Sequence, residues 1–273
     1  MDDNSFRIDL LKYRSDYHRD SGQLTTLNRH VQIWQASLEQ PHAVVNSLRQ
    51  LLAEDELTRS DRFHFERDRR RFIVRRGCLR ILLSRYLGRP PEEIQFTYSE
   101  YGKPSVAHSS AGPPLHFSLA DSAGLVLYAF TCVAQIGIDI ECIRPGYPGE
   151  EIARRFFSAA ELRSLGEVPV ETRQSAFFHC WTRKEAFIKA NGMGLSLPLD
   201  RFEVTLKPGE PAMLRCTRWD DKEAAQWSLR TLEMPSGYVA AIAVRAHDWE
   251  LSSRPFAPAD VLSDKWLTPS RDE

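Results

Sequence analysis

Residues 181–197 read Trp-Thr-Arg-Lys-Glu-Ala-Phe-Ile-Lys-Ala-Asn-Gly-Met-Gly-Leu-Ser-Leu, and the rest of the chain is organised around this stretch. It begins with good helix formers, whereas Asn191 and Gly192 tolerate the left-handed conformation that commonly ends a helix. At about 100° per residue, Phe177, Trp181 and Ile188 share one apolar face. The pattern predicts a core-facing helix over residues 175–190.

The charged side chains of this helix allow two interpretations. Glu185 and Lys189 are four residues apart, so they lie together beside the apolar face. Lys184 projects towards that face, where a lysine is costly unless it has a partner. The arrangement fits a charged ligand bound at the buried edge of the helix. It also fits an ordinary core-facing helix with an ion pair and a lysine that extends its ammonium to water.

The composition limits the class of protein. The chain has 273 residues, enough for one large domain or two of ordinary size. Its formal net charge of -1 gives no overall field that would attract nucleic acid or a membrane surface. No apolar run approaches the ~20 residues that span a bilayer, and the polar start argues against a secretory signal. Five cysteines without a Cys-x-x-Cys pair fit free thiols. We expect a cytoplasmic protein that binds neither nucleic acid nor membrane.

The order of the expected elements suggests a repeated plan. Each half of the chain contains a long helix rich in cations, a glycine-marked turn and later strands. This predicts an α+β fold of two similar halves in one chain, each with a small antiparallel sheet and a long helix. The expected divisions are an extension over 1–29, halves over 30–140 and 141–249, and an outer tail over 250–273. The expected strands are 31–38, 94–98, 115–119, 125–131, 135–141, 202–206, 227–232 and 238–244, and the expected helices are 44–57, 67–87, 151–157, one starting at Ser158, and 175–190.

A row of arginines marks the first long helix. Arg67, Arg71 and Arg75 follow one another at a spacing of four, so they share one side. Such a row is usually a solvated face. A phosphate-binding row is the alternative, because guanidinium groups bind phosphate oxygens in a bidentate fork.

Two carboxylates mark the strand expected over 135–141. Asp139 and Glu141 are two residues apart, so in a strand they point to the same side. Like charges on one face repel each other unless a cation lies between them. Magnesium suits such oxygen ligands, which it combines with water and substrate phosphates. The alternative is a solvated strand face near the end of the strand.

Several motifs in order along the chain together resemble one family, the surfactin-type (Sfp-like) 4'-phosphopantetheinyl transferases. The two most specific are Gly137–Glu141, with the pattern Gly-x-Asp-x-Glu, and Trp181–Lys189, with the pattern Trp-x-x-Lys-Glu-x-x-x-Lys. The others are Tyr-Gly-Lys-Pro at 101–104, Phe-Ser-Leu-Ala-Asp-Ser at 117–122, Arg-Arg-Phe-Phe-Ser at 154–158 and Gly-Leu-Ser-Leu-Pro-Leu at 194–199. The resemblance extends over about residues 31–245.

This resemblance implies a reaction and a binding mode. Coenzyme A (CoA) would bind in the cleft between two α+β halves, and its phosphopantetheine arm would move to a serine of an apo acyl, peptidyl or aryl carrier protein. The by-product would be adenosine 3',5'-bisphosphate. Asp139, Glu141 and Glu185 would hold Mg²⁺, with Mn²⁺ as the alternative ion, on the pyrophosphate of CoA. Glu185 would also be the base that takes the proton of the serine, and Lys189 would offset charge on the leaving pyrophosphate.

The resemblance also implies which residues contact CoA. Lys184 would have either a phosphate-binding role or a structural ion pair. The positions that match CoA-binding residues of the family are Arg59, Arg71, Lys103, Ser118, Ala120, Asp121, Asp139, Lys184 and Lys189. With both halves in one chain, we expect a monomer.

One pair of residues departs from the family pattern. Ala120 and Asp121 replace a serine-histidine pair that touches the phosphates of CoA in many members. An aspartate there repels phosphate unless an arginine, such as one from the helix after Arg67, neutralises it. This departure keeps open the alternative of a non-catalytic relative that binds CoA or carrier protein. A second, independent alternative is a nucleic-acid-binding module on the arginine-rich helix. Balanced charge and few aromatic residues beside those arginines argue against the second.

Overall fold

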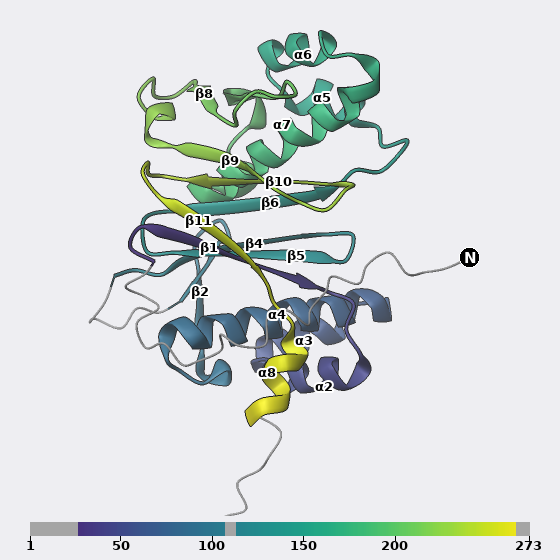
Figure 1. The fold of residues 1–273 in the computed structure, drawn as a ribbon, viewed down its shortest axis with the longest axis vertical. Coiled ribbons are helices and arrows are strands. Elements are labelled where there is room, and N and C mark those ends of the chain that lie inside the picture. Colours follow the sequence, from purple (N-terminus) through teal and green to yellow (C-terminus); the bar gives the residue numbers. More distant parts are fainter. Residues whose placement is uncertain (1–26, 107–112, 266–273) are drawn as a thin grey trace, which may run out of the picture.

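The computed structural model describes residues 27–106 and 113–265, and most of the expected extension over 1–29 lies outside them. Two sheets lie face to face, with one long helix packed on the outer face of each (Figure 1). The molecule thus has four layers in the order helix, sheet, sheet, helix. This arrangement fits the clustering of the buried apolar side chains into three groups, one between each pair of layers.

The first half begins with a strand, continues with three helices and a small hairpin, and ends with two strands. Its long helix, α4, has 22 residues and ends at Gly88 in the left-handed conformation. The elements are β1 (His30–Ser37), α2 (His42–Gln50), α3 (Glu54–Asp61), α4 (Glu66–Leu87), the 3-10 helix η2 (Pro91–Glu93), β2 (Phe96–Tyr98), β3 (Pro104–Val106), β4 (His116–Ser122) and β5 (Leu125–Thr131).

The second half repeats this order. Its long helix, α7, also has 22 residues and ends at Gly192 in the left-handed conformation. The elements are β6 (Ile136–Cys142), α5 (Gly149–Phe156), α6 (Ala159–Gly166), α7 (Val170–Asn191), η3 (Gly194–Ser196), η4 (Leu199–Arg201), β7 (Phe202–Val204), β8 (Leu214–Thr217), η5 (Ala224–Gln226), β9 (Ser228–Leu232) and β10 (Tyr238–Val244). The chain then continues into β11 (Glu250–Pro255) and α8 (Pro258–Lys265).

The strand order confirms the prediction of two similar halves. The first sheet has the order β11-β1-β5-β4 and the second has the order β6-β10-β9. In each half the first strand therefore pairs with the last, and the last pairs with the one before it, all antiparallel. The two halves are built on one plan, to which the first adds a strand from the end of the described chain.

Three details of the expected organisation are corrected by the strand pairing. Residues 135–141 do not complete a meander with β4 and β5, because β6 pairs with β10; the expected boundary at residue 140 falls inside this strand of the second sheet. Residues 250–255 form β11, a parallel neighbour of β1, and not an outer tail. The single helix expected over 44–57 is two helices, α2 and α3. Alternation identifies a strand but not its partner, which explains the first two errors.

Candidate active site

Strand β6 and helix α7 pack unusually closely, and this contact sets the position of the candidate site. A Cβ atom at Gly137 would overlap the backbone of Ala186 and Ala190. Any larger residue there would push α7 away from the strand. The absence of a side chain at Gly137 brings the helix down onto the sheet, so that residues of β6 on this face lie beside those of α7.

Asp139 lies at the centre of this contact, with only 6% of its surface exposed. Its Oδ1 accepts a hydrogen bond from Nζ of Lys189, at 2.7 Å. Its Oδ2 is buried and has no hydrogen-bond partner among the described residues. Burial raises the pKa of the Asp139 carboxyl, although Lys189 opposes this rise. An orphaned carboxylate oxygen in such a place is costly, and a cation would satisfy it.

Glu141 and Glu185 face the same region. Burial and then the charge of Asp139 raise the pKa of both side chains. Oε2 of Glu141 also accepts a hydrogen bond from the hydroxyl of Ser122, at 3.1 Å. The structure thus brings together the four residues that the sequence predicts to form the reaction centre: Asp139, Glu141, Glu185 and Lys189.

The three carboxylates fit a hard divalent cation by their chemistry, although they are not gathered into a ready-made cage. Within residues 27–106 and 113–265, no group of three or more His, Cys, Asp or Glu side chains is close enough to hold a metal ion by itself. Two observations still favour a cation between them: the unpaired Oδ2 of Asp139, and the raised pKa of Glu141 and Glu185, which burial and then the charge of Asp139 produce. Magnesium needs few protein ligands when water and substrate phosphates supply the others.

Two roles were expected for Lys184, phosphate binding or a structural ion pair, and in the structure it forms an ion pair. Its side chain is fully buried, and its ammonium lies 2.8 Å from the carboxylate of Glu161. It also donates hydrogen bonds to the carbonyl oxygens of Leu199 and Phe202, both at 2.7 Å. These partners occupy the ammonium in the core of the second half. Glu161 was not predicted as the partner of Lys184; it also forms a capping box with Ser158 at the start of α6.

Asp121, which departs from the family pattern, is paired with an arginine. Nη1 of Arg75 on α4 donates a hydrogen bond to its Oδ1, at 2.7 Å. One turn earlier on the same helix, Arg71 pairs with Glu39. The structure thus contains an arginine of this helix beside Asp121, which is the condition under which an aspartate at this position would not repel phosphate. The Nε atom of Arg75 is buried and has no hydrogen-bond partner among the described residues.

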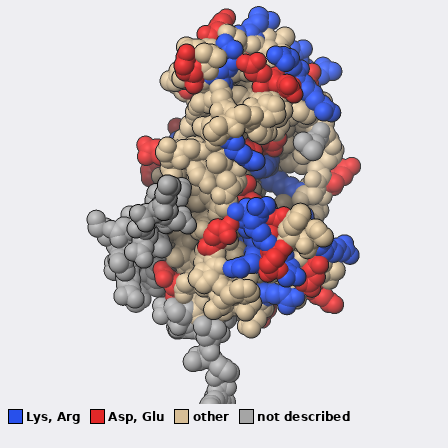
Figure 2. Space-filling view, turned by 90° about the vertical axis from the view of Figure 1, so that its right-hand side faces the viewer, with Lys and Arg blue, Asp and Glu red and all other residues tan. Residues whose placement is uncertain are grey.

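The hairpin that joins β4 to β5 brings the two halves together near these residues. The hydroxyl of Ser122 bonds to β6 twice, through the Glu141 carboxylate and the Cys142 amide. The hydroxyl of Tyr238 on β10 donates to the carbonyl of Ala123, at 3.1 Å. The hairpin and the end of β6 reach the same side of the molecule (Figure 1). Seen from that side, the surface is hollowed between the halves, and Lys and Arg side chains gather around the hollow (Figure 2).

The other expected CoA contacts have varied surroundings. Ser118 is buried and its hydroxyl accepts a hydrogen bond from the Ile138 amide, at 3.1 Å, while Ala120 belongs to the apolar core between the sheets. Both therefore join the two sheets. Arg59 is exposed and lies over the ring of Phe72. Ser122 was missed as a site residue, although it is two residues from Ala120 and four from Ser118, which places it on the same strand face.

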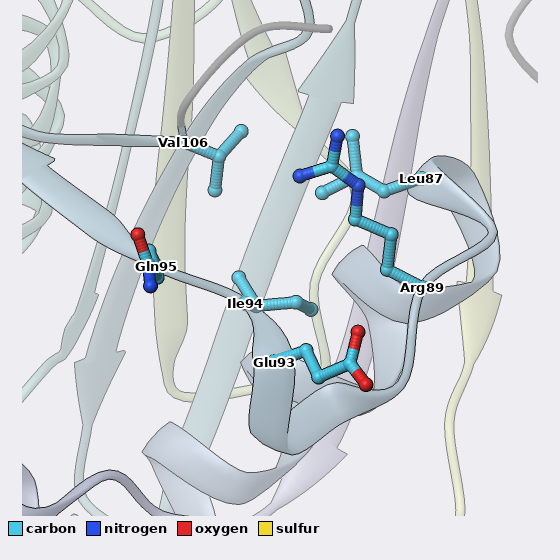
Figure 3. A pocket seen from close by; sticks show the side chains of 6 residues that line it. All are labelled: Leu87, Arg89, Glu93, Ile94, Gln95 and Val106. Atoms are coloured by element: carbon cyan, nitrogen blue, oxygen red, sulfur yellow. The ribbon is translucent and has the colours of Figure 1, made fainter.

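A separate cavity of about 210 Å³ lies away from these residues, in the first half (Figure 3). None of the candidate site residues lines it. Its lining residues are Leu87, Arg89, Glu93, Ile94, Gln95 and Val106.

Comparison with known proteins identifies the family. The profile of the 4'-phosphopantetheinyl transferase superfamily matches residues 135–243, and that of the 4'-phosphopantetheinyl transferase N-terminal region matches residues 32–132. The 4'-phosphopantetheinyl transferase HetI of Nostoc sp. is 40% identical over 83% of this chain and 92% of its own length. The 4'-phosphopantetheinyl transferase Sfp of Bacillus subtilis is 34% identical over 69% of this chain and 80% of its own length. The two profiles match the two structural halves in turn, so this chain belongs to the 4'-phosphopantetheinyl transferases.

Proposed function

We propose that this protein transfers the 4'-phosphopantetheine arm of CoA to a serine of an apo acyl, peptidyl or aryl carrier protein, at the cluster formed by Asp139, Glu141, Glu185 and Lys189. The observation that carries the proposal is the buried, unpaired Oδ2 of Asp139 beside two other carboxylates whose pKa is raised. Burying carboxylates that repel one another destabilises the folded state, so this cluster is better explained as a functional site than as part of the core.

The carboxylates of Asp139, Glu141 and Glu185 are the residues that would hold Mg²⁺ or Mn²⁺. When bound, such an ion offsets the negative charge of the CoA pyrophosphate and of the leaving bisphosphate. The hydrogen bond from Ser122 to Glu141 would keep that carboxylate turned towards the cluster.

Glu185 is the candidate general base. A serine hydroxyl is a weak nucleophile until a base accepts its proton. Burial and the charges of Asp139 and Glu141 raise the pKa of Glu185, which brings it closer to the operating range of a base near neutral pH. Its position on α7, only partly buried, leaves the carboxylate accessible to an incoming hydroxyl.

Lys189 and the arginines of α4 would bind negative charge. The Lys189 ammonium is held at 2.7 Å from Asp139, so it is fixed in place for the charge that develops on the departing phosphate. Arg75, oriented by Asp121, and Arg71 offer guanidinium groups from the first half. Arg59 remains a candidate for the rim of the site. Lys184 would contribute through the packing of α7 and not by contact with CoA.

The setting of the reaction is inferred from the chain as a whole. Both halves of the fold are in one polypeptide, so we infer a monomer that needs no second subunit to complete the site. None of the described helices is both long and apolar enough to cross a membrane. The free thiols support action in the cytoplasm, and we infer carrier proteins of fatty-acid, polyketide or nonribosomal peptide synthesis as the partners.

Mass spectrometry of apo carrier proteins tests this proposal. Several acyl and peptidyl carriers are incubated with the full chain, CoA and Mg²⁺. We expect one serine of at least one carrier to gain one phosphopantetheine arm, and we expect no gain when Mg²⁺ is chelated. A set of carriers that stays unmodified, while HetI modifies them under the same conditions, would contradict the proposal.

A further inference from the structure

The hairpin formed by β2 and β3 belongs to the first half but reaches the second. Its turn is fixed by hydrogen bonds from the Ser99 amide to the Lys103 carbonyl, at 3.0 Å, and from the Gly102 amide to the Ser99 carbonyl, at 2.9 Å. Gly102 adopts φ +80°, in the left-handed region that favours glycine. The turn therefore has one defined shape, and this shape directs the side chain of Lys103 away from its own half.

The Lys103 ammonium joins two elements of the second half. It donates hydrogen bonds to the carbonyl of Ile136, at 3.2 Å, and to the carbonyl of Ala190, at 2.9 Å. Ile136 is the first residue of β6, and Ala190 lies in the last turn of α7. The carbonyls of a last helical turn have no partner within the helix and carry its partial negative charge, so a cation there is favourable.

These two elements carry all four residues of the proposed reaction centre. Ala190 follows Lys189 directly, and the Lys189–Asp139 ion pair crosses the same gap between α7 and β6 that Lys103 bridges. A shift of the last turn of α7 would move Lys189 relative to Asp139. Lys103 is thus the contact from the first half that holds this turn in place.

The burial of Lys103 is costly in itself. Burial lowers the pKa of its ammonium to about 8. Two neutral carbonyls satisfy the hydrogen bonds of the group but do not offset its charge. A methionine of similar length would avoid this cost, which indicates that the lysine serves something other than stability.

We propose that Lys103 is a positioning residue for the transfer reaction: it fixes the end of α7 against the start of β6 and so keeps Lys189 and Glu185 in register with Asp139. This differs from the contact with CoA that the sequence motif implies for Lys103. The inference depends on the proposed function, because it assumes that these residues carry out the transfer.

Steady-state kinetics of two variants separate positioning from CoA binding. In Lys103→Met the hydrogen bonds are lost, and we expect kcat to fall on the order of tenfold because small displacements of reacting groups are costly. The KM for CoA should stay within about twofold, since no contact with CoA is removed. Lys103→Arg keeps N–H donors and should recover part of the lost kcat. Lys222→Met, which removes an exposed lysine of the second half, is the control and should leave both constants unchanged.

The outcomes distinguish this inference from the proposed function. Failure of the unmodified chain to transfer the arm would contradict the proposed function itself. If it transfers and Lys103→Met raises the KM for CoA with kcat unchanged, Lys103 binds CoA and the inference is wrong. If Lys103→Met does not fold, the test rests on Lys103→Arg compared with the unmodified chain. A lower kcat at constant KM for CoA then supports the positioning role, whereas an unchanged kcat or a raised KM contradicts that role.

Discussion

The two halves of the molecule share a fold but differ in chemistry. Both contain a 22-residue helix packed on a sheet whose first strand pairs with its last. At the sixteenth position of the helix, the first half has Ile81 and the second has Glu185. On the strand face under the helix, the first half has the buried Trp34 and the second has Asp139. The two halves therefore share their architecture, but at these positions only the second half has carboxylates, which belong to the proposed reaction centre.

What the halves share extends to a buried ion pair. Arg80 and Lys184 both occupy the fifteenth position of their helix. Each pairs with a glutamate of the preceding short helix, Glu56 in the first half and Glu161 in the second. Each cation also donates to two backbone carbonyls of the segment that follows its helix. The pairs therefore anchor equivalent parts of the two halves, and their role is structural.

The largest expected effect tests whether these two anchors are equivalent. Removing one partner of a buried ion pair leaves the other charge uncompensated, which costs about 3–5 kcal/mol. We expect Lys184→Met to lower the free energy of unfolding by about this amount and Arg80→Met to lower it less, because Glu56 keeps its second partner, Arg76; urea denaturation measures both. A Lys184→Met variant of unchanged stability but raised KM for CoA would show that Lys184 binds substrate, and the two anchors would not be equivalent.

The next effect concerns the sixteenth helix position. Glu185→Gln keeps the size of the side chain but cannot accept a proton. We expect kcat to fall about a hundredfold or more, the usual contribution of a general base. The dissociation constant for CoA, measured by calorimetry, should change little. Near-normal transfer at saturating CoA and carrier would rule out Glu185 as the base.

A matched pair at the twentieth helix position compares the halves directly. Lys189 and Arg85 occupy equivalent positions, but Lys189 contacts Asp139, whereas the Arg85 guanidinium lies over Trp34 and Phe256. We expect Lys189→Met to lower kcat on the order of tenfold or more, because it removes a cation aimed at developing charge. Arg85→Met should leave kcat unchanged. Equal losses in both variants would mean that helix packing, and not charge at the site, explains the effect.

The smallest expected effect concerns the contribution of the first half to CoA binding, measured as the KM for CoA. Asp121 orients Arg75, so Asp121→Ala should free the arginine and raise the KM for CoA about threefold, as expected for a partly exposed ion pair. The maximal rate should stay nearly constant. A lower KM would show that Asp121 repels the phosphates of CoA, and that its pairing with Arg75 does not aid binding.

The sequence predicts local features well and long-range partners poorly. Helical periodicity located both long helices, and alternation placed Asp139 and Glu141 on one strand face, because these patterns are contained within one element. The sequence did not identify β10 as the partner of β6, or Glu161 as the partner of Lys184. Those pairings depend on how distant segments fold together, which no single element encodes. Lys103 illustrates the same limit: its motif was recognised, but its contacts with Ile136 and Ala190 follow only from the packing of the two halves.

In the proposed function, the carboxylates of the second half hold a divalent cation for the transfer. The most direct test is a titration of Mn²⁺ monitored by electron paramagnetic resonance, with CoA present, on the unmodified chain and on Asp139→Ala. Asp139→Ala should remain folded and lose most transfer activity, since a missing metal ligand costs several kcal/mol of transition-state stabilisation. We predict tight binding of one Mn²⁺ to the unmodified chain and much weaker binding to the variant. Equal Mn²⁺ binding by the two proteins, with transfer unchanged, would contradict the account.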